Sequence, residues 1–235
     1  MRYFNLTIIS IFGLLGLYFL TRIAGVMVPP IFSDEAMYVH MAQIINEDWN
    51  DLFIGKASTL KPLFLWVIAF YLNIFDDPLY AGRLASITGG AFSLVGVYFL
   101  ARELYNEKVA IVSSVIYIFC PFFIFFERWA LMESWVTAFG VWAVWISVKI
   151  VNEKYLRKKD FIFLGLFLGL GFFTKPTALM FFPAPFIIFI IWNTYRKDNF
   201  FIYFLLTLFT VLVINLPYFT TGQNITFPNR NPIFA

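Results

Sequence analysis

Carboxylates and cations at the edges of long apolar runs are the residues of this sequence that could do chemistry. Asp34 and Glu35 are adjacent acids after the first apolar run, and Glu133 precedes a later run. Basic candidates stand at similar edges: Lys61, Arg83, Arg128 and Lys175. A carboxylate can deprotonate an attacking hydroxyl or amine, while Arg and Lys hold phosphate oxygens. Together these groups suit a substrate that joins a phosphate to an apolar tail.

The composition identifies the solvent in which these groups must work. The 235 residues are 61% hydrophobic and only 13% charged, whereas soluble domains carry about 25% charged residues. We therefore expect an integral membrane protein, with residues 1–235 forming a single membrane domain. The net charge of +3 is spread over loops, so nucleic-acid binding has no support. The lone Cys120 cannot form an internal disulfide and is expected to be a packing residue.

Apolar runs predict an all-α fold with seven transmembrane helices, whose ends extend into the flanking residues. The runs are Phe4–Leu20, Leu84–Leu100, Val109–Phe126, Trp135–Ile150, Phe161–Phe173, Thr177–Trp192 and Phe200–Phe219. Pro62–Phe75 has only 14 residues and is predicted to be a short re-entrant or interfacial helix. Asp34–Glu47 is predicted to be an amphipathic helix on the membrane surface. Pro183 and Pro185 are expected to kink the sixth span.

Loop charges predict the orientation of these spans. With a cytoplasmic N-terminus and Pro62–Phe75 outside, the inner loops hold ten basic and five acidic residues. The outer side then holds seven basic and nine acidic residues, as the positive-inside rule requires. Basic clusters flank residues 161–192, so the chain must turn back near Thr174–Thr177. This topology gathers all the candidate acids and cations on the non-cytoplasmic face.

Each candidate also has a structural interpretation. Ser33 can be an N-cap, with Asp34 and Glu35 favoured by the helix dipole. Glu133 can be neutral or paired with Arg128. The individual lysines and arginines can be helix-end anchors. The single histidine, His40, is expected to be an ordinary interfacial residue.

Six short motifs occur in order along the chain. They are Ser33-Asp34-Glu35-Ala36, Lys61-Pro62-Leu63-Phe64-Leu65-Trp66, Arg83-Leu84-Ala85-Ser86, Arg128-Trp129-Ala130-Leu131-Met132-Glu133, Phe173-Thr174-Lys175-Pro176 and Asn215-Leu216-Pro217-Tyr218. The set resembles the GT-C glycosyltransferases that use polyprenyl-phosphate sugars, above all protein O-mannosyltransferases and lipid A aminoarabinose transferases. The resemblance implies transfer of a sugar from a polyprenyl-phosphate donor in the lipid bilayer. The acceptor would be a protein, lipid or glycan on the non-cytoplasmic side.

The resemblance also implies roles for the candidates. Asp34, Glu35 and Glu133 would be catalytic acids, with Asp34 as the base. The residues that would bind the substrate phosphate are Lys61, Arg83, Arg128 and Lys175. A divalent cation, Mg²⁺ or Mn²⁺, would use Asp34 and Glu133, although Leu60 stands where relatives often carry an acid or a histidine. Relatives continue beyond seven spans, so the chain is expected to lack their C-terminal region.

Two other classes of protein remain open on the sequence. A transporter or flippase of lipid-linked intermediates could use the same cations, but it needs polar groups near the membrane midplane, and the sequence offers few. A non-catalytic membrane subunit would need no catalytic acid. Replacement of Asp34 separates an enzyme from both.

Overall fold

The computed structural model describes residues 2–55 and 61–220 of the chain. Across these ranges the chain is helical and contains no strand. The α-helices are α1 (Arg2–Ile23), α2 (Ser33–Glu47), α3 (Leu63–Leu72), α4 (Pro78–Leu104), α5 (Glu107–Phe119), α6 (Pro121–Phe126), α7 (Glu133–Asn152), α8 (Lys158–Thr174), α9 (Pro183–Ile191) and α10 (Phe200–Thr220). Short 3₁₀ helices are η1 (Trp49–Asp51), η3 (Pro176–Phe181) and η4 (Thr194–Arg196).

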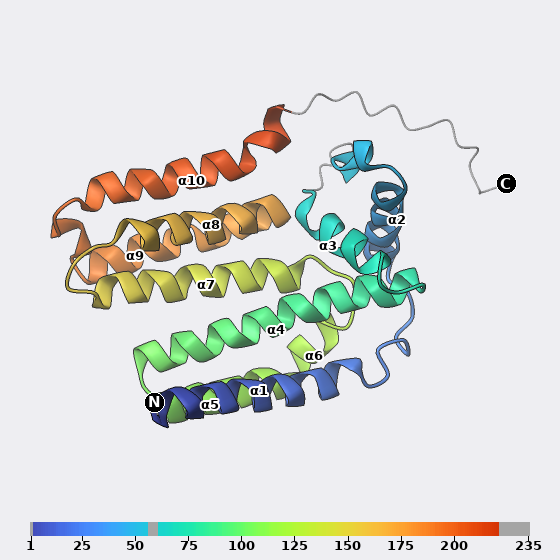
Figure 1. Ribbon diagram of the computed structural model, residues 1–235, viewed down its shortest axis with the longest axis horizontal. Helices are drawn as coiled ribbons and strands as arrows, with labels where there is room; N and C mark the ends of the chain where they lie inside the picture. Colours follow the sequence, from blue (N-terminus) through green and yellow to red (C-terminus); the bar gives the residue numbers. More distant parts are fainter. Residues whose placement is uncertain (1, 56–60, 221–235) are drawn as a thin grey trace.

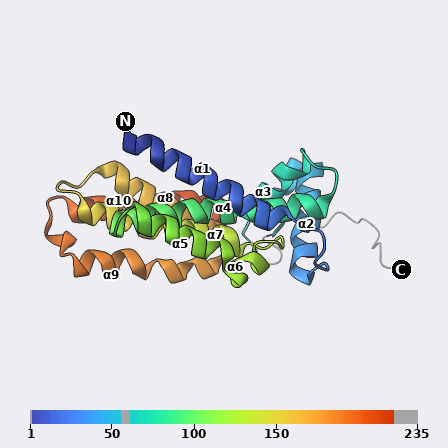
Figure 2. The same cartoon turned by 90° about the horizontal axis from the view of Figure 1, so that it is seen from below.

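The long helices lie side by side in a bundle, and α2 and α3 cover one of its ends (Figure 1). The most extensive packing joins α4 to α7, α8 to α10, α7 to α8 and α4 to α5. The view from below shows α2 and α3 at the same end of the bundle (Figure 2), where both pack against α4. The predicted all-α architecture is therefore confirmed.

Small residues allow α8 and α10 to pack closely. A Cβ atom built on Gly165 would lie 2.6 Å from the backbone oxygen of Thr207, and one on Gly169 would lie 2.8 Å from Ile214. Such contacts leave no room for a side chain at Gly165 or Gly169 of α8. Close backbone approach at small residues is typical of helix pairs in membranes, where water does not drive helices together.

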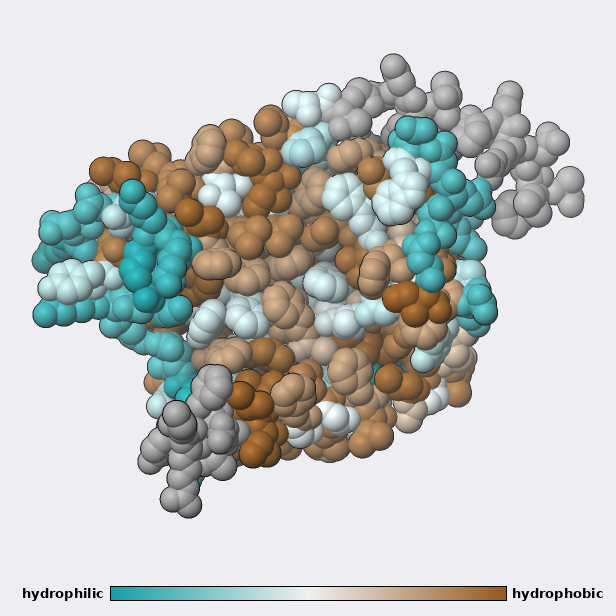
Figure 3. All heavy atoms as spheres, in the orientation of Figure 1, coloured by the Kyte–Doolittle hydropathy of each residue, from teal (hydrophilic) through white to brown (hydrophobic). Residues whose placement is uncertain are grey.

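Three helices of the described residues are long and apolar enough to cross a bilayer: α4, α7 and α10. Shorter apolar helices cover Thr7–Ile23, Leu63–Leu72 and Pro176–Ile191. On the face shown in Figure 3, apolar residues form a broad middle band between two hydrophilic ends. The distribution fits a membrane protein, and seven spans remain a prediction.

Prolines divide two of the predicted runs. Val109–Phe126 is not continuous, because α5 ends at Phe119 and α6 begins at Pro121 after an extended Cys120. Cys120 is half-buried at this break rather than enclosed in the core. The predicted turn near Thr174 is confirmed, since α8 ends at that residue. The return begins as the 3₁₀ helix η3, and Pro183 starts α9 instead of kinking a longer helix.

The connections predicted to share the inner side lie together at the end of the bundle opposite α2 (Figure 1). Arg102 Nε is 3.1 Å from a carboxylate oxygen of Glu107, which ties α4 to α5. Lys149 Nζ is 3.6 Å from Asp160, which ties α7 to α8. Lys197 Nζ donates to the backbone oxygen of Glu153 at 2.7 Å. The sequence therefore grouped these loops correctly.

Candidate functional site

Glu35 is a fully buried carboxylate in the first turn of α2. Its two oxygens accept from Arg83 Nε at 2.8 Å and from Arg83 Nη2 at 2.9 Å. Neither side chain is exposed, and such a two-point pair fixes orientation as well as distance. Glu35 also accepts from the backbone N–H groups of Ala130 at 2.9 Å and Phe32 at 3.3 Å. This carboxylate therefore joins α2 to α4 and to the connection before α7.

The remaining N–H groups of Arg83 hold the connection between α1 and α2. Nη1 donates to the backbone oxygen of Val26 at 2.6 Å, and Nη2 donates to Pro29 at 3.1 Å and Pro30 at 3.4 Å. These contacts shape the segment that leads to Asp34. We interpret Glu35 and Arg83 as structural residues, instead of the catalytic and phosphate-binding roles that the resemblance implied.

The start of α2 differs from the predicted cap. The N-cap is Phe32 and Ser33 is already the first helical residue. Glu35 supplies the cap by accepting the Phe32 N–H. The helix begins here because the negative side chain satisfies an N–H group that the first turn leaves open.

Asp34 is exposed at the surface, unlike its buried neighbour Glu35. One turn later Tyr38 is buried, and its pKa is raised to about 12 by burial first and then by the charges of Asp34 and Glu133. Both carboxylates are therefore close enough for their charges to affect the Tyr38 phenol. At neutral pH this phenol stays protonated, so it can donate its O–H and can also accept a hydrogen bond. Sequence reasoning missed Tyr38, although its spacing of four residues from Asp34 places both on one helix face.

Glu133 and Lys175 form an ion pair that remains accessible. Glu133 is the first residue of α7, and Lys175 follows the end of α8. The Lys175 Nζ contacts a Glu133 oxygen, while the side chains are 27% and 48% exposed for Lys175 and Glu133. The pair replaces the Glu133–Arg128 pairing considered from the sequence. An exposed pair of this kind contributes little to stability.

Arg128 binds the same connection that Arg83 holds. Its Nη2 donates to the backbone oxygen of Ala24 at 2.7 Å and to that of Gly25. Its Nε is buried without a hydrogen-bond partner among the residues described. The carbonyls do not neutralise the guanidinium, so Arg128 keeps its positive charge.

Lys61 is enclosed by aromatic rings just before α3. Only 4% of the residue is exposed. Its Nζ lies 3.5 Å from the ring centre of Tyr218, 4.6 Å from that of Phe172 and 4.9 Å from that of Phe219. Cations are attracted to the negative faces of such rings. We call Phe172, Tyr218 and Phe219 the aromatic cage. Phe172 lies in the last turn of α8, three residues before Lys175.

A second buried ion pair was missed by sequence reasoning. Arg22 Nε lies 2.9 Å from Glu127, which also accepts from Tyr18 at 3.0 Å and from Tyr117. Arg22 further donates to the backbone oxygen of Ile118 at 2.6 Å. The available signal was an ionisable residue at each of two apolar edges. This network ties α1 to α5 and to the connection after α6.

Gly90 on α4 is the residue that gives this network its space. A Cβ there would lie 2.1 Å from the Tyr18 hydroxyl and 2.5 Å from the Glu127 carboxyl carbon. We expect Gly90→Ala to lower the free energy of unfolding by about 1–3 kcal/mol, because overpacking forces the network apart. Thermal unfolding in detergent measures this effect. Gly16→Ala is the matched control, because nothing lies within 4 Å of its Cβ. Equal melting of the wild type and the Gly90 variant would contradict the described network.

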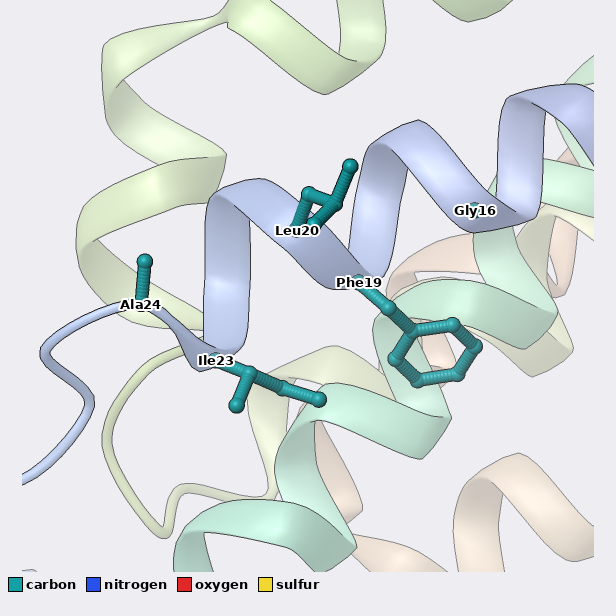
Figure 4. A pocket seen from close by; sticks show the side chains of 5 residues that line it. All are labelled: Gly16, Phe19, Leu20, Ile23 and Ala24. Carbon is teal, nitrogen blue, oxygen red and sulfur yellow. The ribbon is translucent and has the colours of Figure 1, made fainter.

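A shallow hollow elsewhere on the bundle does not compete with this site. It lies on α1 and is lined by Gly16, Phe19, Leu20, Ile23 and Ala24 (Figure 4). All of these side chains are apolar, and none of the seven candidate residues is among them. The hollow has no group that could hold a phosphate.

Comparison with known proteins identifies the family. Residues 58–219 match the sequence profile described as dolichyl-phosphate-mannose-protein mannosyltransferase. This range covers well over half of the chain and contains five of the six motifs. The chain belongs to this mannosyltransferase family. The resemblance predicted from the motifs is confirmed.

Curated relatives carry a consistent description. The undecaprenyl phosphate-alpha-4-amino-4-deoxy-L-arabinose arabinosyl transferase of Pseudomonas aeruginosa (strain UCBPP-PA14) is 28% identical over 68% of this chain and 30% of its own length. An arabinosyl transferase of the same kind from Pseudomonas fluorescens is 26% identical over 86% of this chain and 38% of its own length. One from Proteus mirabilis is 28% identical over 79% of this chain and 35% of its own length. The chain thus spans about a third of the length of these relatives. No solved structure matches.

The carboxylates of this mannosyltransferase-family chain are the side chains that could hold the predicted divalent cation. No group of three or more His, Cys, Asp or Glu side chains with the geometry of a metal site occurs in the described ranges. Asp34 and Glu133 nevertheless both act on Tyr38. Mg²⁺ is usually held by one or two carboxylates together with substrate phosphates. A Mg²⁺ or Mn²⁺ ion held by Asp34 and Glu133 therefore stays a prediction. Leu60 lies outside the described residues.

Proposed function

We propose that the chain is the donor-binding module of a membrane glycosyltransferase. It would move a sugar from a polyprenyl-phosphate donor to an acceptor on the non-cytoplasmic side of the membrane. The observation that carries this proposal is the convergence of Asp34, Glu133 and Lys175 at one end of the bundle. Asp34 and Glu133 are exposed and both act on Tyr38, and Lys175 is paired with Glu133. Family membership and the donors in the relatives' names support the class of substrate.

The chemistry follows from the charges of this cluster. Asp34 takes the proton of the acceptor hydroxyl or amine as the acceptor attacks the anomeric carbon. The new bond forms as the bond from that carbon to the phosphate oxygen breaks, so a single displacement inverts the anomeric configuration. The departing phosphate gains negative charge, which Lys175 and Arg128 stabilise. Lys61 is a further ligand for the phosphate once its ammonium leaves the aromatic cage.

The proposed topology has seven spans and a cytoplasmic N-terminus. The spans would be α1, α4, α5 with α6, α7, α8, η3 with α9, and α10, which run between the two ends of the bundle (Figures 1 and 2). The basic connections share one end, and the positive-inside rule places that end in the cytoplasm. Helices α2 and α3 would then lie at the outer interface, beside the site.

The donor and the metal can be specified further. The relatives' names give a 4-amino-4-deoxy pentose on undecaprenyl phosphate, and we propose an amino sugar of this kind as the donor. Asp34 and Glu133 would hold a Mg²⁺ or Mn²⁺ ion with the donor phosphate. Such an ion would supply positive charge to the leaving phosphate. A protein, lipid or glycan acceptor fits the site equally.

Donor binding tests this proposal directly. The purified protein in lipid nanodiscs is titrated with labelled undecaprenyl-phosphate-linked aminoarabinose, with and without EDTA. We expect saturable binding that free undecaprenyl phosphate competes for and undecaprenol does not, and that EDTA weakens. A folded protein that binds no donor would refute the transferase proposal and favour a non-catalytic subunit. Movement of the donor across vesicle membranes without sugar transfer would favour a flippase.

A further inference from the structure

The aromatic cage has a selectivity that the proposed reaction does not use. Three rings from two helices enclose a single ammonium, with the nearest ring centre 3.5 Å away. Ring faces attract a positive charge much more strongly than a neutral hydroxyl. Surfaces of this kind recognise ammonium groups in ligands as well as in side chains. The cage is therefore a cation site, and Lys61 occupies it.

The proposed phosphate role of Lys61 conflicts with this placement. An ammonium buried among rings cannot at the same time contact phosphate oxygens at the surface. Lysine has a flexible four-carbon stem, which allows the charge to move while the backbone stays in place. Movement of Lys61 to the phosphate would leave the three rings without a cation. A second ammonium in the cage would restore the lost attraction.

We propose that the aromatic cage recognises a positively charged amine on the donor sugar, in exchange for Lys61. This inference rests on the proposed glycosyl transfer and specifies its donor. Before binding, Lys61 fills the cage formed by Phe172, Tyr218 and Phe219. On binding, the Lys61 ammonium moves to the donor phosphate, and the amine of the sugar takes its place between the rings.

The position of the cage suits a sugar attached to that phosphate. Phe172 precedes Lys175 by three residues on the same helix end. Lys175 is paired with Glu133, whose charge acts on Tyr38 together with that of Asp34. A sugar bound in the cage would thus adjoin the carboxylates of the proposed reaction. The exchange also keeps the charge within the cage constant, since one ammonium replaces another.

Two donors that differ in one group test the exchange. The probes are undecaprenyl-phosphoryl 4-amino-4-deoxy-L-arabinose and undecaprenyl-phosphoryl L-arabinose, which carries a hydroxyl in place of the amine. Affinities are measured by titration in nanodiscs at pH 7. We expect the wild type to bind the amine donor about tenfold more tightly, as one desolvated cation–π site allows.

Variants of one ring assign the preference to the cage. Tyr218→Leu is expected to reduce the tenfold ratio to within about twofold, while Tyr218→Phe keeps the ring and the ratio. Phe219→Leu is a second ring deletion, which covers the case in which the leucine variant at position 218 does not fold. Undecaprenyl phosphate without a sugar should bind the Tyr218→Leu protein at least as tightly as the wild type, because Lys61 leaves the cage more easily.

The outcomes separate this inference from the proposed function. A wild type that binds both sugar donors equally, or a ratio that survives both ring deletions, would overturn the cage. In those cases binding of undecaprenyl phosphate would still support a lipid-phosphate site. A folded wild type that binds none of the three lipids would overturn the transferase proposal and the cage together.

Discussion

Replacement of Asp34 by asparagine is expected to lower the turnover of glycosyl transfer by about 10²- to 10⁴-fold, the usual contribution of a general base. The amide has nearly the size of the carboxylate but cannot take the proton of the acceptor. Asp34 is exposed at the start of α2, so its replacement should leave the fold intact. Donor binding should persist, weakened by no more than EDTA weakens it in the wild type, because Asp34 is also a proposed ligand of the metal ion. Transfer of labelled sugar and donor binding are measured on the same preparation.

Asp76→Asn is the matched control for this experiment. Asp76 is also an exposed acid, and it lies in the connection between α3 and α4 at the same end of the bundle. This variant should keep both turnover and binding. Equal turnover of the Asp34 variant and the wild type would exclude Asp34 as the base. If the wild type and the Asp34→Asn variant both bind the donor without turnover, the chain is a donor-binding module that needs further segments, such as those of its longer relatives.

Composition and motif order predicted the class of fold and the family. A chain with so few charges can only bury its surface in lipid, and its apolar runs have the length of helices. The turn at Thr174 and the helix that starts at Ser33 were predictable because prolines and acids mark helix ends locally. Breaks at Cys120 and Phe182 were less clear, since apolar residues continue on both sides of each proline.

The division of roles between Asp34 and Glu35 was not readable from the sequence. Consecutive helical residues point about 100° apart, so one carboxylate faces the surface while the other is buried. Which of the two is buried depends on Arg83, 48 residues later along the chain. The partner of Glu133 and the rings around Lys61 also come from distant helices. Local patterns locate such residues at the correct end of the bundle but do not pair them.

Replacement of Glu35 by glutamine is expected to lower the free energy of unfolding by about 3–5 kcal/mol. The variant leaves Arg83 as an uncompensated charge in a fully buried position, which is costly even though an intact buried pair adds little. The double variant Glu35→Leu/Arg83→Met removes both charges and should recover part of this loss. Unfolding in detergent, followed by heat and by denaturant, measures all three proteins.

Comparison of Glu133→Gln with Glu35→Gln distinguishes a structural acid from an acid of the functional site at this end of the bundle. The ion pair of Glu133 with Lys175 is exposed, so we expect from Glu133→Gln a loss of stability of no more than about 1 kcal/mol. Its effect should fall on donor binding and turnover, because Glu133 is paired with Lys175, a proposed ligand of the donor phosphate. If the Glu35 variant melted like the wild type and lost turnover, Glu35 would belong to the chemistry, as the motif first implied. A large loss of stability at Glu35 and a small one at Glu133 would instead assign the buried acid to the scaffold and the exposed acid to the site.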